Sequence, residues 1–135
     1  MNKKNQTLKD IYVEAINNYK KNNLKNTELL CYKILSIDPN HVDSIALLAA
    51  VFAMNKNFVK AKEFTLKGLE IKPENISFLV NLGTTYRELG DFKEAINSYK
   101  KVLKKDPKHT NANYNLGLVY HILRELETAK KYLLR

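Results

Sequence analysis

Apolar residues recur at spacings of three and four along most of the chain, which predicts amphipathic α-helices and an all-α fold. The pattern is clearest over residues 79–103, where it forms two stripes. The first stripe is Leu79, Leu82, Tyr86 and Leu89, and the second is Phe92, Ala95, Ile96, Tyr99, Val102 and Leu103. Gly90 lies between the stripes and is expected to end the first helix in a left-handed conformation. We expect Asp91 to cap the second helix, with Glu94 completing a capping box.

The prolines mark a repeat of 34 residues. Pro39, Pro73 and Pro107 are equally spaced (73 − 39 = 34 and 107 − 73 = 34), and proline cannot continue a helix. A helix-breaking residue at a fixed period indicates stacked helical units. With the proline at position 32, the predicted repeats are 8–41, 42–75, 76–109 and a truncated 110–135. These repeats form one predicted domain, 8–135, after a disordered or frayed segment, 1–7.

Two positions of the repeat carry small residues. Position 8 reads Ala15, Ala49, Gly83 and Gly117. Position 20 reads Thr27, Ala61, Ala95 and Ala129. The distance between packed helices depends on the side chains at their contact, so small residues here predict a close helix pair in each repeat.

The stretch Asn81–Ala95, with Tyr99 and Pro107, resembles the tetratricopeptide repeat, and Asn115–Tyr120 with Ala129 resembles it again. This resemblance implies a right-handed α-solenoid of antiparallel helix pairs, a superhelix of about 3.5–4 repeats. It also implies a scaffold for protein–protein interaction rather than an enzyme.

The same resemblance implies that the first helices line a concave groove for a protein or peptide partner. The groove residues expected from it are Tyr12, Ile16, Leu47, Ala50, Met54, Val80, Asn81, Thr84, Arg87, Tyr114, Asn115, Leu118 and His121. Asn81 and Asn115 occupy the position where the family often pairs an asparagine amide with the ligand backbone, and an amide both donates and accepts. The alternative is that both asparagines only belong to the consensus and that the partner docks elsewhere.

The charge distribution argues against two ligand classes. The net charge is +9, with 20 lysines and 3 arginines. Most lysines fall on predicted second helices and their turns, facing outward: Lys60, Lys62, Lys67, Lys93, Lys100, Lys101, Lys104, Lys105, Lys130 and Lys131. A polyanion reader would concentrate cations on its binding surface, so nucleic acid is not the expected partner, and polyanion binding by the convex face is the weaker hypothesis. A clamp for an acidic C-terminus is not expected either, because Tyr12, Ala46 and Val80 stand where lysine would be wanted.

No pattern in the sequence indicates catalysis, a metal or a cofactor. A zinc site needs three or four converging ligands, and the spacing of His41, His109 and His121 offers none. Cys31 cannot form an internal disulfide and is expected to be a buried spacer. We expect no small-molecule substrate. With no membrane-length apolar run and no secretion signal, we expect a cytoplasmic location.

The last repeat stops at position 26, with Tyr132, Leu133 and Leu134 in an unfinished second helix. Two interpretations stay open: the chain is the amino-terminal piece of a longer protein, or this end packs on a second copy. The alternative to a free-standing scaffold is therefore a domain that recruits substrates or partners for a larger enzyme such as a transferase.

Overall fold

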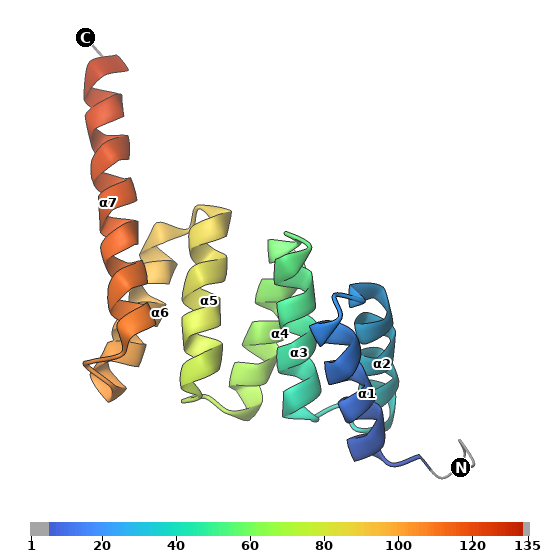
Figure 1. Ribbon diagram of the computed structural model, residues 1–135. Helices are drawn as coiled ribbons and strands as arrows, with labels where there is room; N and C mark the ends of the chain where they lie inside the picture. The colour runs from blue at the N-terminus through green and yellow to red at the C-terminus, as the bar shows by residue number, and fades with distance from the viewer. Residues whose placement is uncertain (1–5, 134–135) are drawn as a thin grey trace. The chain divides into compact units, whose positions relative to one another are not determined.

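The computed structural model describes residues 6–133, with side chains to Lys131. These residues form seven α-helices and no strand (Figure 1). The helices are α1 (Leu8–Lys20), α2 (Leu24–Ile37), α3 (Val42–Met54), α4 (Phe58–Ile71), α5 (Ile76–Leu89), α6 (Phe92–Lys105) and α7 (Thr110–Leu133). The predicted all-α fold of paired helices is therefore confirmed.

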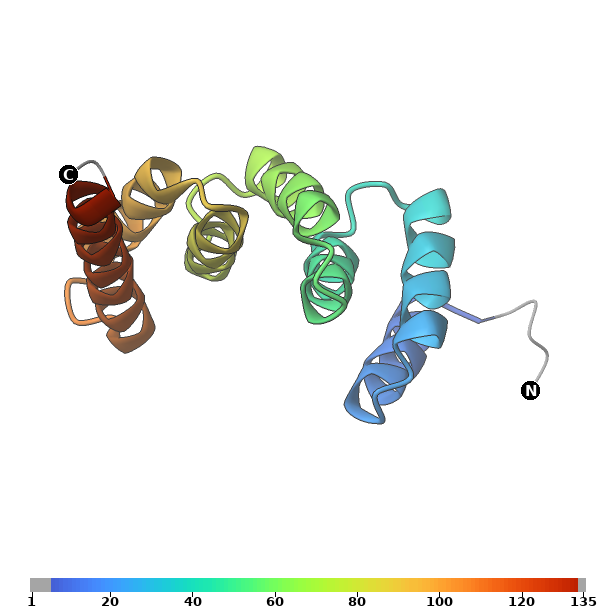
Figure 2. The ribbon, with the colours of Figure 1, turned by 90° about the horizontal axis from the view of Figure 1, so that it is seen from above.

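The chain divides into two compact units, at Pro73 and Glu74. In the first unit α1 packs on α2, α2 on α3, and α3 on α4. In the second unit α6 packs against both α5 and α7 (Figure 2). The division lies close to the predicted boundary between the second and third repeats.

The residue two places after each proline caps the next helix. The Nδ1 atom of His41 accepts a hydrogen bond from the Ser44 amide (3.2 Å), and Nδ1 of His109 accepts one from the Ala112 amide (3.1 Å). Asn75, at the equivalent position, accepts from the Phe78 amide at 2.9 Å. These side chains satisfy amide groups that helix geometry leaves without partners. Both histidines thus have a structural role that explains their shared position in the repeat.

The turn within each helix pair uses a left-handed residue at position 15. Gly90 has φ +82°, as predicted, and Asn22 (φ +64°) and Lys56 (φ +60°) do the same in the first two repeats without glycine. The predicted capping box at Asp91 is wrong, because its side chain makes no capping hydrogen bond. Its backbone angles do not account for this, because Asn57, with a similar ψ of 76°, accepts a capping hydrogen bond from the Lys60 amide at 3.3 Å.

The fourth repeat differs from its prediction. Helix α7 runs unbroken through Arg124 and Glu125, where the turn of a helix pair was expected. Both residues are good helix formers and neither is glycine, although Lys56, also a good helix former, does turn the chain at this position of the second repeat. Of the three residues assigned to an unfinished second helix, Leu134 and the side chains of Tyr132 and Leu133 lie outside the described structure.

The small residues pack as predicted in three repeats. Ala15, Ala49 and Gly83 are buried at position 8, and Thr27, Ala61 and Ala95 at position 20. In the fourth repeat Gly117 and Ala129 are exposed instead. The predicted close helix pair is therefore absent there.

Candidate functional site

In the first unit, the predicted groove residues lie on α1 and α3, and most of them are apolar and at least half-buried. Leu47 is buried, while Tyr12, Ile16 and Ala50 are half-buried. Met54 alone of this set is exposed, at 53%. The ring of Tyr12 lies 5.6 Å from that of His41, and burial, with smaller contributions from Asp43 and Cys31, raises the Tyr12 pKa. This face offers apolar contact but no amide.

In the second unit, the predicted residues lie on α5 and α7 and are more accessible. We call this the α5–α7 face. Its members are the predicted residues of this unit, together with Asn111, which was not among them: Val80, Asn81, Thr84, Arg87, Asn111, Tyr114, Asn115, Leu118 and His121. Asn81, Asn111 and His121 are exposed, and Tyr114 is 70% exposed. The face therefore combines polar groups with an accessible aromatic ring.

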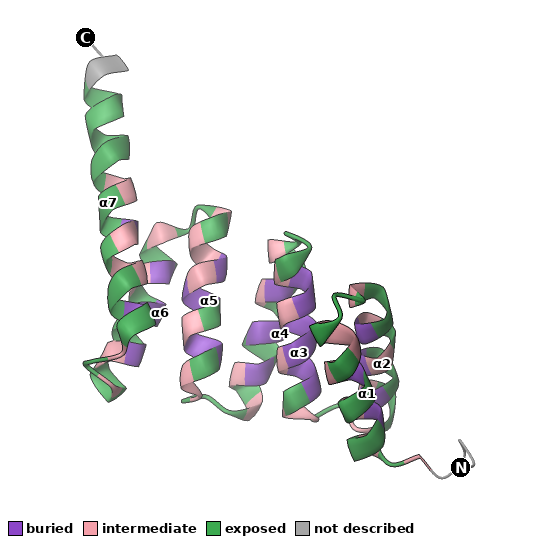
Figure 3. Cartoon of the chain, viewed as in Figure 1, coloured by how far each residue is buried: buried purple, intermediate pink, exposed green. Residues whose placement is uncertain are grey.

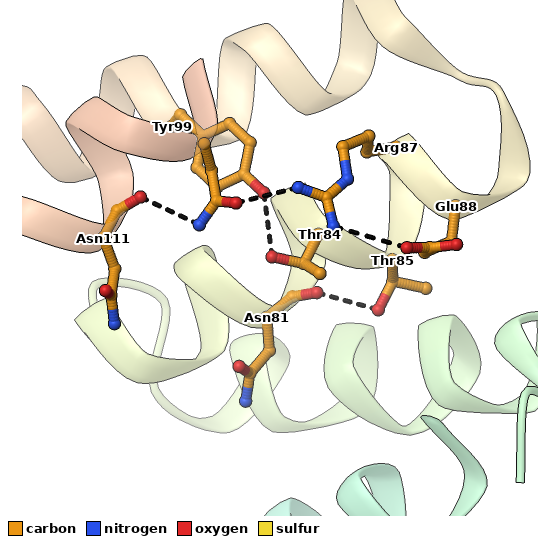
Figure 4. A network of polar contacts seen from close by, with 8 residues as sticks. Asn81, Thr84, Thr85, Arg87, Glu88, Tyr99 and Asn111 are labelled. Carbon is orange, nitrogen blue, oxygen red and sulfur yellow. Dashed lines mark hydrogen bonds and ion pairs between the residues drawn. The ribbon is translucent and has the colours of Figure 1, made fainter. Parts of the chain in front are cut away.

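A polar network joins the two helices of this face (Figure 4). Arg87 on α5 donates from one guanidinium nitrogen to Asn115 Oδ1 on α7 at 2.8 Å, across 28 residues of sequence. Its other terminal nitrogen pairs with Glu88 at 3.3 Å. Asn115 Nδ2 in turn donates to the Asn111 carbonyl at 2.8 Å. Both polar atoms of the Asn115 amide are thus engaged within the fold.

The accessible amides of the α5–α7 face belong to Asn81 and Asn111. Within the described residues neither side-chain amide makes a hydrogen bond, although both backbone carbonyls accept one. Figure 4 shows the two amides pointing away from the network and to the same side. The sequence singled out Asn81 and Asn115, so one of the two accessible amides was missed. The one available signal was that Asn111 also falls on the expected groove side of its helix.

The buried side chain of Tyr99, on α6, supports this network through Thr84 of α5. Its hydroxyl is 2.8 Å from Thr84 Oγ1, and the whole side chain is buried. Burial raises the pKa of Tyr99, and the hydrogen bond with Thr84 and the charge of Arg87 oppose that increase. A buried hydroxyl that has its partner fixes the ring under α5.

Several exposed lysines belong to α6, which is not part of the α5–α7 face. Lys93, Lys100, Lys101 and Lys104 are exposed and have no ion pair in the part of the chain described. Lys105 pairs with Glu74 at 2.8 Å, which lowers the pKa of that carboxyl. Lys130 and Lys131 do not lie on a second helix as expected, because they belong to α7.

No group of three or more metal-ligating side chains occurs among residues 6–131. His121 is an exposed residue of α7 and belongs to no such group among residues 6–131. None of the helices described is both long and apolar enough to cross a bilayer.

Cys31 is fully buried, as predicted, and burial raises the pKa of its thiol from 9.0 to about 12. The folded thiol keeps its proton where the unfolded thiol ionises. The protonated Cys31 thiol therefore makes its full contribution to the free energy of unfolding below pH 9. This contribution is lost as the pH rises from 9 to 12. We expect the free energy of unfolding to fall by about 1.4 kcal/mol per pH unit above pH 9 from this residue. Denaturant titrations of the protein and of Cys31→Ala between pH 8 and 11 measure it, and equal slopes would contradict the expectation.

Two protein-family models match the chain. The one described as TPR repeat matches residues 83–123, and the one described as anaphase-promoting complex, cyclosome, subunit 3 matches residues 20–102, more than half of the chain. A UDP-N-acetylglucosamine–peptide N-acetylglucosaminyltransferase of Caenorhabditis elegans is 26% identical over 88 residues. That match covers 65% of this chain and 8% of the transferase, so the chain spans a small part of that relative.

Solved structures with the same fold include other repeat domains. The first TPR of Spaghetti (RPAP3), solved with an HSP90 peptide, has a TM-score of 0.83 at 17% identity, covering 88% of this chain and 94% of that one. A tetratricopeptide repeat protein from Parabacteroides merdae has a TM-score of 0.80 at 22% identity, covering 87% and 47%. A mutant O-GlcNAc transferase of Thermobaculum terrenum has a TM-score of 0.78 at 21% identity, covering 90% and 23%. With the period, the helix pairs and the matched family models, these likenesses show that the chain belongs to the tetratricopeptide repeat family.

Proposed function

We propose that this chain is a peptide-binding module whose α5–α7 face holds an extended segment of a partner protein. The observation that carries the proposal is the pair of accessible amides, Asn81 and Asn111, beside a fixed polar network. An extended peptide presents backbone N–H and C=O groups that pair in a sheet edge or with side-chain amides. The two asparagines can donate to and accept from such a backbone without reading its sequence.

The network beside the amides prepares the face for binding. Arg87 and Asn115 tie α5 to α7 before any ligand arrives, so the two helices need not be ordered when the peptide docks. Pre-organised sites lose less conformational entropy on binding. Tyr114, 70% exposed, supplies an aromatic surface for an apolar side chain of the peptide.

The α5–α7 face does not favour an acidic peptide tail. Arg87 is already paired with Glu88 and Asn115, and its side chain is 16% exposed. The HSP90 peptide bound by the Spaghetti (RPAP3) domain is therefore not the ligand we assign to this chain. We expect binding to depend on backbone pairing and apolar contact.

Removing the accessible amides should weaken peptide binding. Peptides selected from a random library on the intact protein provide the ligands. Each of Asn81→Ala and Asn111→Ala should lower affinity about 3- to 10-fold, since a net hydrogen bond contributes about 1 kcal/mol. The loss should be similar for selected peptides of different sequence, because the amides contact the backbone. Fluorescence anisotropy of labelled peptides measures it.

Asn97→Ala is the matched control, because Asn97 is an exposed asparagine of α6, outside the α5–α7 face. Its affinity should equal that of the unmodified protein. Asn115→Ala is a poor test, since it also removes the bond to Arg87. Selected peptides that bind the double variant Asn81→Ala with Asn111→Ala as tightly as the intact protein would contradict the assignment of this face.

A second candidate function follows from the likeness to the N-acetylglucosaminyltransferase. In this alternative the chain recruits protein substrates for a transferase domain. Fusion of the chain to a catalytic domain that lacks repeats should raise turnover of substrates carrying a selected peptide segment. The fusion with Asn81→Ala and Asn111→Ala should not. Equal turnover by both fusions would argue against recruitment through this face.

A further inference from the structure

At position 15 of the repeat, the single helix α7 differs from the three helix pairs of the described chain. Asn22, Lys56 and Gly90 all have positive φ there and turn the chain between two helices. The fourth residue of this series is Arg124 (90 + 34 = 124), and it lies inside the straight helix. Lys56 shows that a long side chain at this position does not prevent the turn. The straight course of α7 is therefore a departure from a turn that this chain makes three times.

The surface that would receive a second helix is present on α7 and uncovered. On α5, Gly83 receives the Tyr99 ring of α6 so closely that a built Cβ would lie 2.7 Å from it. At the equivalent Gly117, no atom of the described structure outside its own helix lies within 4 Å of such a Cβ. Tyr86 of α5 is half-buried, whereas its equivalent, Tyr120, is 47% exposed.

The residues that would cover this surface are also present and exposed. Every residue from Arg124 to Lys131 is exposed, and this end of α7 extends past α5 and α6 in Figure 3. Leu126 and Ala129 hold the positions of Phe92 and Ala95, which α6 uses to pack on α5. Leu126 is 53% exposed while Phe92 is half-buried, and Ala129 is exposed while Ala95 is fully buried. The chain thus carries the residues of both sides of a helix-pair interface, and both sides are exposed on α7.

We propose that α7 is a two-state element: the segment 126–131 leaves the straight helix and folds back onto Gly117 and Tyr120. On one straight helix the two surfaces cannot meet, because Gly117 and Ala129 are about 18 Å apart along the axis. A turn at Arg124 and Glu125, like that at Gly90 and Asp91, brings them together. The straight state leaves a helix-sized surface open, and the folded state closes it.

This proposal does not rest on the peptide-binding function. Asn111 lies about 120° around α7 from Gly117, so folding back leaves the Asn111 amide accessible. The two states are stabilised differently, since the straight state keeps all its helical hydrogen bonds and the folded state gains apolar burial. Small changes at the turn should therefore shift the populations.

Pulsed electron paramagnetic resonance between spin labels at Thr110→Cys and Lys131→Cys measures the two states. The labels are placed in a Cys31→Ala background, so that only the two introduced cysteines react. The straight helix separates the labelled positions by about 31 Å, and the folded state brings them within about 20 Å. The unmodified turn should show both distances. Replacing it by the sequence of the third repeat, Arg124→Gly with Glu125→Asp, should raise the ratio of the short-distance to the long-distance population by about tenfold or more.

Added to this turn variant, Leu126→Lys should restore the long distance, because it charges the docking residue. Thr128→Lys, which is about 200° away around the helix, should leave the short distance in place. The proposal is overturned if the unmodified turn gives the long distance alone, or if the turn variant stays straight. It is also overturned if the short distance survives Leu126→Lys, since the contact would then not use the repeat interface.

Discussion

Gly83→Ala should lower the free energy of unfolding of the second unit by about 1–3 kcal/mol, the usual cost of overpacking a tight contact. The added Cβ would lie 2.7–2.9 Å from three ring atoms of Tyr99. The ring cannot move away easily, because it is fully buried and its hydroxyl is held by Thr84 at 2.8 Å. Glycine in a helix otherwise costs stability, so its presence here is explained by this contact.

Gly117→Ala is the matched control for Gly83→Ala, and its effect should have the opposite sign. Gly117 occupies the same repeat position, but no described atom lies near its built Cβ beyond its own helix. Alanine there should raise the free energy of unfolding by up to about 1 kcal/mol through helix propensity. Urea titration followed by circular dichroism, with hydrogen exchange to locate the change, measures both. Equal effects of the two substitutions would contradict the described packing of Gly83.

Tyr99→Ala should have the largest effect of any substitution considered, a loss of about 3–5 kcal/mol from the second unit. Tyr99 is the largest fully buried side chain of the chain's described part, and it fills the space between α5 and α6. Its removal would also leave Thr84 without its hydroxyl partner and take away the support beneath the network of Arg87 and Asn115. The same urea titrations measure the loss.

Tyr99→Phe separates the two contributions of this residue. It keeps the ring and removes only the hydrogen bond to Thr84, so it should cost about 1 kcal/mol. Hydrogen exchange of α5 and α6 should accelerate strongly in Tyr99→Ala and slightly in Tyr99→Phe, while α1 and α2 of the first unit keep their rates. A Tyr99→Phe variant as unstable as Tyr99→Ala would mean that the hydroxyl, not the ring, holds the pair together.

The repeat and its helix pairs could be predicted because they depend on local signals with a fixed period. The three prolines set the register, and Gly90 marked a turn that the structure confirms. The turns at Asn22 and Lys56 carry no glycine, yet the same position adopts positive φ, so the period carried information that the residue type did not. The capping box at Asp91 was wrong although the residue type favours it, and the backbone angles do not explain the difference, since Asn57 caps α4 with nearly the same angles.

The straight course of α7 and the choice of accessible amides could not be predicted from the repeat. Leu126 and Ala129 match the pattern of a second helix, but the pattern cannot state whether the turn before them forms. Asn115 matched the consensus as well as Asn81 did. Its amide is engaged because Arg87, 28 residues earlier, reaches it, and contacts of that range depend on tertiary packing.

The central claim, that the amides of Asn81 and Asn111 bind a peptide backbone, is tested most directly by nuclear magnetic resonance. A selected peptide is titrated into ¹⁵N-labelled protein while the side-chain amide signals of the asparagines are followed. The signals of Asn81 and Asn111 should shift to saturation with the peptide's affinity, while that of Asn97 should stay in place. Saturable binding that leaves the Asn81 and Asn111 signals unmoved would contradict this claim.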